Sequence, residues 1–100
     1  KIMPHFLYLI RPVNDWSAGN FTEEEGRLMG EHFAYLKQKF DEGKVMMVGP
    51  CVDTTMGIGI LETDTREEAE EIGNNDPAVK AGIVTLEIKD YRVSLWRNMK

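Results

Sequence analysis

The stretch "EHFAYLKQKFDEGKVMMVG" (residues 31–49) joins a helix pattern to a strand pattern through a single glycine. Together with a residue one turn earlier, its apolar positions recur at the spacing of one helical face: Met29, His32, Phe33, Leu36 and Phe40. Gly43 is expected to end the helix near residue 41 or 42, and "KVMMVG" (44–49) predicts a strand that stops at Gly49-Pro50. The helix therefore carries a histidine on its apolar face, directed at the core or at a hole in it.

The segments around this stretch continue the alternation of strands and helices. "HFLYLI" (5–10) predicts a first strand that closes at Pro12. Thr22 is expected to cap the first helix, and Glu25, three residues later, to reach back and complete a capping box. "MGIGILET" (56–63) predicts a third strand.

The C-terminal half adds a second helix and a short helical turn. Thr65 and Glu68 predict another capping box at the start of "TREEAEEIG", and Gly73 is expected to end that helix. In "DPAVKAG", Asp76 precedes a proline at the first helical position, which predicts a capped helical turn.

A fourth strand completes the order of elements. "IVTLEIKDY" (83–91) alternates apolar and polar residues, as a strand with one buried face does. The order βαββαβ, with right-handed crossovers, predicts an antiparallel sheet with two helices on one face, which is a ferredoxin-like α+β fold. The first and third strands are central in that topology.

The predicted sheet has more apolar surface than two helices can cover. Strand one carries Leu7 and Leu9 on one face and Phe6, Tyr8 and Ile10 on the other. Because large exposed apolar patches are rare on monomers, we predict a homodimer packed sheet against sheet, with the tail containing Trp96 reaching across the interface. We treat residues 1–100 as a single domain with a core at about 5–91 and a tail at 92–100.

Composition excludes several classes of partner. The net charge of −5, with acids concentrated at 22–25 and 62–71, is unsuited to nucleic acid and to anionic membranes. No apolar run approaches the ~20 residues that a membrane-spanning helix needs. The single cysteine, Cys51, rules out an internal disulfide, and we predict a cytoplasmic protein.

Two residues are candidates for acid–base chemistry, and each has a structural alternative. His32 is either a core histidine with satisfied ring nitrogens or a general base in a pocket between helix and sheet. Asp76 is either a helix cap only or also the carboxylate that orients a histidine, as in catalytic triads. Sequence alone favours the cap.

The segment "VGPCVD" (48–53) has a similar ambiguity. Gly49 and Pro50 mark a turn, or they let the backbone approach a ligand with Asp53 at the rim. Cys51 has no visible base partner, so a small buried hydrophobe is the better interpretation.

The glycines of the third strand, Gly57 and Gly59, either relieve packing or leave a cavity near His32. "GIGILE" is no dinucleotide fingerprint, no P-loop is present, and His5, His32 and Cys51 lack the spacing of metal ligands. We therefore predict no cofactor and no metal.

The quoted segments, followed by "TREEAEEIGNNDPAVKAGIVTLEI", resemble the YciI-like, or YCII-related, domain over about residues 5–95. The shared pattern is a helical histidine, a later Gly-Pro, an acid in the next turn, and an Asp-Pro…Gly after the second helix. The resemblance implies a dimeric α+β barrel and a His–Asp pair in a pocket. By motif, that pair is His32 and Asp76, with Gly49-Pro50 nearby.

Relatives with known activity include chlorohydroxyquinol dehydrochlorinase and chloromuconolactone dehalogenase. By resemblance, the chain is expected to be a cofactor-free lyase or isomerase for a small organic molecule, with Tyr8, Gly49, Pro50 and Asp53 as substrate-binding residues. The alternatives are a non-catalytic small-molecule-binding dimer and a small monooxygenase of the same barrel superfamily. The loop Arg11–Phe21 is longer than the family pattern, and its Trp16 is a candidate lid over the pocket. Arg11 is the one candidate anion binder.

Overall fold

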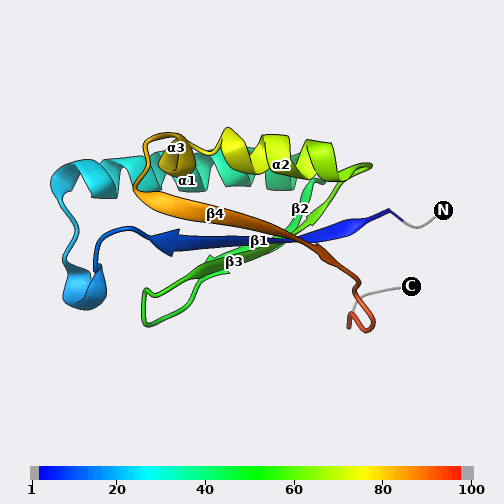
Figure 1. The fold of residues 1–100 in the computed structure, drawn as a ribbon, viewed down its shortest axis with the longest axis horizontal. Coiled ribbons are helices and arrows are strands. Elements are labelled where there is room, and N and C mark those ends of the chain that lie inside the picture. Colours follow the sequence, from blue (N-terminus) through cyan, green and yellow to red (C-terminus); the bar gives the residue numbers. More distant parts are fainter. Residues whose placement is uncertain (1–2, 98–100) are drawn as a thin grey trace.

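In the computed structural model, which describes residues 3–97, a four-stranded antiparallel sheet carries three α-helices on one face (Figure 1). The chain follows the predicted βαββαβ order with the short extra helix: β1 (His5–Pro12), α1 (Glu23–Asp41), β2 (Val45–Pro50), β3 (Gly57–Glu62), α2 (Arg66–Asn74), α3 (Pro77–Lys80) and β4 (Val84–Tyr91). The strand order is β2-β3-β1-β4, so β1 and β3 are central as predicted. The α+β ferredoxin-like fold is confirmed.

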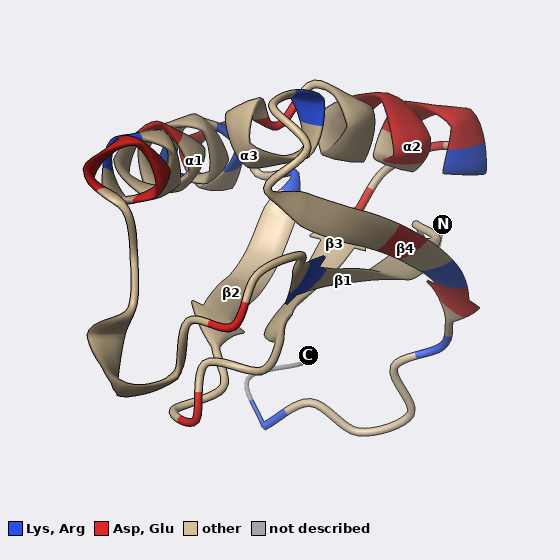
Figure 2. Cartoon of the chain, turned by 60° about the vertical axis from the view of Figure 1, so that its left-hand side comes forward, with Lys and Arg blue, Asp and Glu red and all other residues tan. Residues whose placement is uncertain are grey.

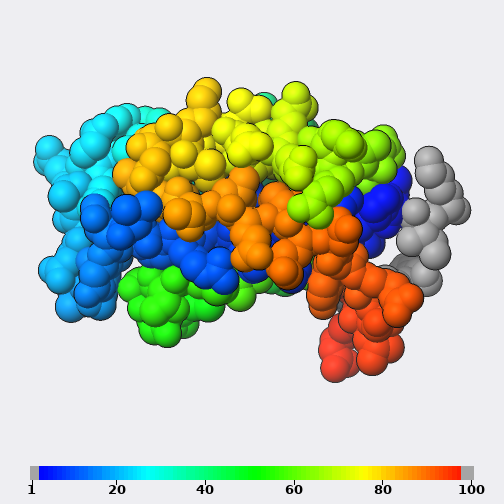
Figure 3. Space-filling model, viewed as in Figure 1, coloured from blue at the N-terminus to red at the C-terminus, as the bar shows by residue number. Residues whose placement is uncertain are grey.

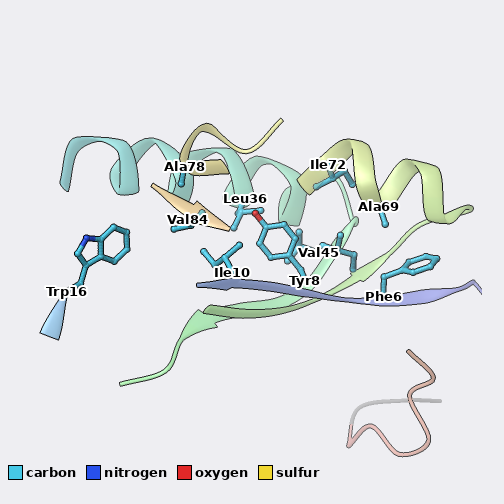
Figure 4. Close-up of a cluster of buried hydrophobic side chains, with 11 residues drawn as sticks. Phe6, Tyr8, Ile10, Trp16, Leu36, Val45, Ala69, Ile72, Ala78 and Val84 are labelled. Carbon is cyan, nitrogen blue, oxygen red and sulfur yellow. The ribbon is translucent and has the colours of Figure 1, made fainter. Parts of the chain in front are cut away.

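The core lies between the sheet and the helices (Figure 4). Phe6, Tyr8 and Ile10 of β1 point into it, and the strand register places Gly59 and Ile88 on either side of Tyr8. Burying these large side chains supplies the main free energy of folding, at about 1.5–3 kcal/mol for each fully buried apolar side chain.

Helix α1 begins and ends where the sequence predicts. The Glu25 backbone N–H donates to the Thr22 hydroxyl (3.0 Å), and the Thr22 N–H donates to the Glu25 carboxylate (2.9 Å), which completes the capping box. Three glutamates in the first turn complement the helix dipole, as Figure 2 shows in red. At the other end, Glu42 is the C-cap and Gly43 takes a φ of +82°.

The buried face of α1 differs from the one predicted. Phe33 is 66% exposed and Phe40 is 50% exposed, so two members of the proposed stripe lie at its edge or outside it. The helix is rolled so that Leu36 lies against the sheet and the Tyr35 hydroxyl donates to the Ile72 carbonyl (2.8 Å). His32 stays on the inward side.

Two predictions for helix α2, its capping box and its end at Gly73, were wrong. The Glu68 N–H donates to the Thr65 hydroxyl (3.1 Å), but the Glu68 carboxylate does not return to Thr65. It accepts instead from the Asp64 N–H (3.2 Å) and from Lys44 (2.7 Å), whose charge makes it the stronger partner. The second capping box is therefore only half formed.

Gly73 does not end α2, which continues to Asn74. It is buried inside the helix, where a Cβ would lie 2.7 Å from a Leu86 methyl and 3.4 Å from the Tyr8 ring. The glycine is needed for close approach of α2 to the sheet and not for a turn.

The sheet face opposite the helices is covered by no element of the described chain. The strand registers place Leu7, Leu9, Ile58 and Ile60 on this face. Beyond β4 the chain leaves toward the same side, and it projects from the body of the molecule (Figures 1 and 3). Within residues 3–97, no helix has the length and apolar character to cross a membrane. The last three residues of the predicted tail lie outside the described residues.

Candidate functional site

A hydrogen-bonded chain of three side chains lies at the centre of the helix layer. His32 Nδ1 is 2.7 Å from Asp76 Oδ2, and the Tyr8 hydroxyl donates to the same oxygen. Figure 4 shows Tyr8 rising from β1 with its hydroxyl directed at the helices. The three residues come from β1, α1 and the start of α3, so the fold brings together positions 44 and 68 residues apart.

The two carboxylate oxygens of Asp76 have different partners. Its Oδ1 accepts from the Ala78 backbone N–H (2.9 Å), which caps α3, while its Oδ2 accepts from His32 and Tyr8. The side chain is fully buried. Three donors offset the cost of removing this carboxylate from water.

The pairing leaves one ring nitrogen of His32 available. Because a carboxylate oxygen accepts, Nδ1 carries the proton in this pair and the neutral ring keeps its lone pair on Nε2. Nε2 makes no hydrogen bond to any described residue, and it is not fully buried. The side chain keeps 12% of its surface exposed, and it lines a cavity.

This cavity of about 360 Å³ lies between α1, the sheet and the loop that follows β1. Its wall consists of Tyr8, Ile10, Pro12, Trp16, Phe21, Met29, His32, Phe33, Leu36, Val48, Gly49, Pro50, Thr54, Met56, Gly57 and Val84. Tyr8 and His32 are the only residues with an ionisable side chain in the wall formed by the described residues, and only the imidazole offers a basic nitrogen.

A family model for the YCII-related domain matches residues 6–97. The chain belongs to the YCII-related domain family. Over 62 residues it is 39% identical to the uncharacterized protein YjpA of Bacillus subtilis (strain 168), which covers 62% of this chain and 73% of that protein.

A solved structure shares the fold of this YCII-related domain. It is 5-chloro-2-hydroxyhydroquinone dehydrochlorinase (TftG) from Burkholderia phenoliruptrix AC1100, in complex with 2,5-dihydroxybenzoquinone. The TM-score is 0.64 with 20% sequence identity, and the match covers 87% of this chain and 93% of the other.

Most of the residues predicted for the site of the YCII-related domain line the cavity. Tyr8, Gly49 and Pro50 are part of the wall. Asp53 is not. It lies on the exposed turn after β2, where its carboxylate accepts from the Thr55 N–H (3.1 Å) and hydroxyl (2.7 Å), and Thr54 takes the place at the cavity that the sequence suggested for Asp53.

Other candidates in this YCII-related domain lie elsewhere. Arg11 pairs with Glu87 (3.2 Å) on the surface and does not line the cavity, and Cys51 is half-buried outside it. Within residues 3–97, no three His, Cys, Asp or Glu side chains are grouped so as to hold a metal ion.

The sequence left open whether the β3 glycines relieve packing or leave a cavity, and the structure gives a different answer for each. A Cβ at Gly59 would lie 3.1 Å from the Met47 carbonyl, so Gly59 relieves packing against β2. Gly57 does both: it lines the cavity, and a Cβ there would lie 2.9 Å from Ile10.

The bond between Tyr8 and Asp76 was missed by sequence reasoning, which placed Tyr8 at the substrate. The signal was available, because a tyrosine on the core face of a central strand needs a partner for its hydroxyl. Burial and the negative charge of Asp76 together raise the pKa of Tyr8 far above its usual 10, and burial raises the pKa of Tyr35 to about 12.

The raised pKa of Tyr8 predicts a specific loss of stability in alkali. The folded state keeps the phenol neutral, whereas the unfolded chain ionises it near pH 10. This contribution is therefore fully present below pH 10 and is lost as pH rises further, by about 1.4 kcal/mol per pH unit. We expect Tyr8→Phe to show a shallower fall in the free energy of unfolding between pH 9.5 and 11, measured by urea denaturation. Tyr91→Phe, at an exposed ring, is the control, and equal slopes for all three proteins would contradict the assignment.

Proposed function

We propose that this YCII-related domain is a cofactor-free lyase or isomerase in which His32 removes a proton from a small, ring-shaped substrate. The observation that carries the proposal is the chain from Tyr8 through Asp76 to His32, which ends in an available nitrogen at the wall of an apolar cavity. A core histidine with only a structural role has no need for an open nitrogen beside a space of this size.

The chemistry follows from the order of the hydrogen bonds. His32 Nε2 takes a proton from the carbon next to a substrate carbonyl, and the electron pair of the broken C–H bond moves into an enolate. In a dehydrochlorination, this pair then forms a carbon–carbon double bond while the C–Cl bond breaks and chloride leaves with its electrons. In an isomerisation, the imidazolium returns the proton to a different carbon. Asp76 holds the ring in the tautomer that keeps Nε2 free, and its charge stabilises the imidazolium.

The comparisons support the choice of substrate class. A protein of the same fold is named as a dehydrochlorinase of a chlorinated hydroxyhydroquinone and binds a dihydroxybenzoquinone. A planar six-membered ring also suits the cavity here, with its apolar wall and one base.

The proposal is tested by incubating the protein with chlorinated hydroquinones, chlorinated hydroxyhydroquinones and chloromuconolactones. We expect saturable release of chloride from at least one of them, with no uptake of oxygen at an oxygen electrode. Saturable binding without chloride release or proton exchange would favour the non-catalytic binding protein. Consumption of oxygen would favour the monooxygenase.

We also propose that the chain forms a homodimer through the sheet face that carries no helix. The half-buried side chains of Leu7, Ile58 and Ile60 on this face, together with the strongly exposed Leu95 in the tail, support this arrangement. Light scattering at micromolar concentration should give twice the chain mass of 11.4 kDa, and Ile58→Glu should give the monomer mass. A monomer mass for both proteins would contradict the proposed homodimer.

A further inference from the structure

The loop between β1 and α1, residues 13–22, is tied at both ends to one carboxylate. Glu25 Oε2 accepts from the Asn14 side-chain amide (2.7 Å), and Glu25 Oε1 accepts from the Thr22 backbone N–H (2.9 Å). Glu25 is buried. These bonds, which we call the Glu25 latch, hold the pKa of Glu25 below its usual range, with the Thr22 N–H making the largest contribution.

Between Asn14 and Phe21, the loop has no other side-chain or backbone hydrogen bond to the rest of the described chain. Its remaining bonds are internal, from the Ser17 N–H to Asp15, from Asn20 to Ser17 and from Phe21 to Gly19. Immediately before it, the Val13 N–H donates to the Ile83 carbonyl (3.0 Å) and fixes the start of the loop, so the latch is the main polar restraint on the residues after Val13.

The same loop supplies an aromatic part of the cavity wall. Trp16 is only 5% exposed, and its ring lies 5.0 Å from that of Phe21 between centroids. Figure 4 shows Trp16 at one end of the core cluster, facing Ile10 and Val84, with which it lines the cavity.

The indole N–H of Trp16 lies near the Glu25 carboxylate of the latch. Its Nε1–H is buried and makes no hydrogen bond of ordinary geometry with a described residue, but it lies close enough to the Glu25 carboxylate to help lower the pKa of that group. A buried donor without a good partner costs about 1–3 kcal/mol, so the closed position of Trp16 depends on restraints elsewhere in the loop.

We propose that residues 13–22 form a lid, closed by the Glu25 latch, and that Trp16 is the specificity residue that packs on the face of a planar substrate ring. Apart from Thr54 and Met56 in the short turn between β2 and β3, the other wall residues belong to helices and strands. The long segment between β1 and α1 carries only the single 3-10 turn Ser17–Gly19, so it is the part that can move to admit a ligand. The ring-binding half of the proposal rests on the proposed function. The latch half does not.

The latch can be tested by exchanging its donor and acceptor. Asn14→Asp keeps the capping box, because Glu25 is unchanged, but it places a second carboxylate opposite that of Glu25, and neither group has a hydrogen to donate. Adding Glu25→Gln restores a donor–acceptor pair with the direction reversed, and the net charge of the double variant equals that of the parent. A lid held by this bond should open in the single variant and close again in the double variant.

The readout is the fluorescence of Trp16 in a Trp96→Phe background, where Trp16 is the sole tryptophan. Without ligand, we expect Asn14→Asp to raise the acrylamide quenching constant by at least about twofold, and Asn14→Asp/Glu25→Gln to return it to the parent value. With 2,5-dihydroxybenzoquinone as the probe, we expect quenching of Trp16 in the parent and affinity about tenfold weaker in Asn14→Asp, in line with the loss of one charged hydrogen bond.

The two arms separate the possible failures. Unchanged acrylamide quenching in Asn14→Asp, or no rescue by the double variant, would overturn the latch. Normal latch behaviour with no binding of the quinone by calorimetry would instead count against the ring ligand, and so against the proposed function. Quinone binding that leaves Trp16 fluorescence unchanged would remove Trp16 from the site.

Discussion

Replacing His32 with asparagine is expected to lower turnover by about 10²–10⁴-fold while leaving ligand affinity within a few-fold of the parent. The asparagine amide N–H takes the place of Nδ1–H and can still donate to Asp76, so the buried carboxylate keeps its donors. What disappears is the available ring nitrogen at the cavity. The measurement is kcat for the substrate found in the screen, together with calorimetric binding of an unreactive analogue.

The second histidine of the chain provides a matched control. His5 pairs with Glu62 (3.0 Å) near the start of β1, and it does not line the cavity. His5→Asn is expected to leave turnover unchanged. A His32→Asn variant that keeps full turnover, or one that loses affinity and turnover in equal measure, would contradict the role of His32 as base.

Two substitutions of Asp76 are expected to separate its effect on the free energy of unfolding from its effect on turnover. Asp76→Ala removes the cap of α3 and leaves the Tyr8 hydroxyl and His32 Nδ1 without their common acceptor in a fully buried place. We expect it to lower the free energy of unfolding by about 3–5 kcal/mol.

Asp76→Asn should cost far less stability, about 1–2 kcal/mol, because asparagine is an equally good cap and the Tyr8 hydroxyl can rotate to accept. Its amide N–H₂ would face His32 Nδ1, so the imidazole must accept there and carry its proton on Nε2. Turnover should then fall by up to about 10⁴-fold in a protein that remains folded.

Urea denaturation, kcat and the ¹⁵N shifts of the His32 ring measure the three effects together. If Asp76→Asn keeps both its turnover and the parent tautomer, the carboxylate is only a cap. If Asp76→Ala unfolds as the parent does, the hydrogen bonds to Asp76 contribute little.

Local patterns predicted the fold well because they depend on neighbouring residues. The Thr22–Glu25 box, Gly43 and the Asp76-Pro77 cap all form as expected, since each is satisfied within one turn. The predictions that were wrong depended on distant partners. Lys44 draws the Glu68 carboxylate away from its box, and the approach of Leu86 is what requires Gly73.

The candidate site shows the same division. A helical histidine and a capping aspartate are visible in the sequence, but their 2.7 Å contact depends on how α1 and α3 meet above the sheet. Phe33 and Phe40 are exposed because of the rotation of α1 about its own axis. Helical periodicity alone does not determine this rotation to within one residue. The hydrogen bond from Asn14 to Glu25 likewise depends on the path of the loop that carries Trp16, which no periodic pattern encodes.

The buried carboxylate of Asp76 receives its donors from β1, α1 and α3, and this has a consequence for the order in which the molecule assembles. A folding intermediate that contains only β1, α1 and β2 holds His32 without a carboxylate, and its ring is free to exchange tautomers. The imidazole is locked only after α3 has docked, at the end of the longest loop closure in the site. We therefore expect the tautomer of His32 to report whether α3 has docked on α1 and β1. Under the proposed function, partly folded molecules without this contact should be inert toward substrate.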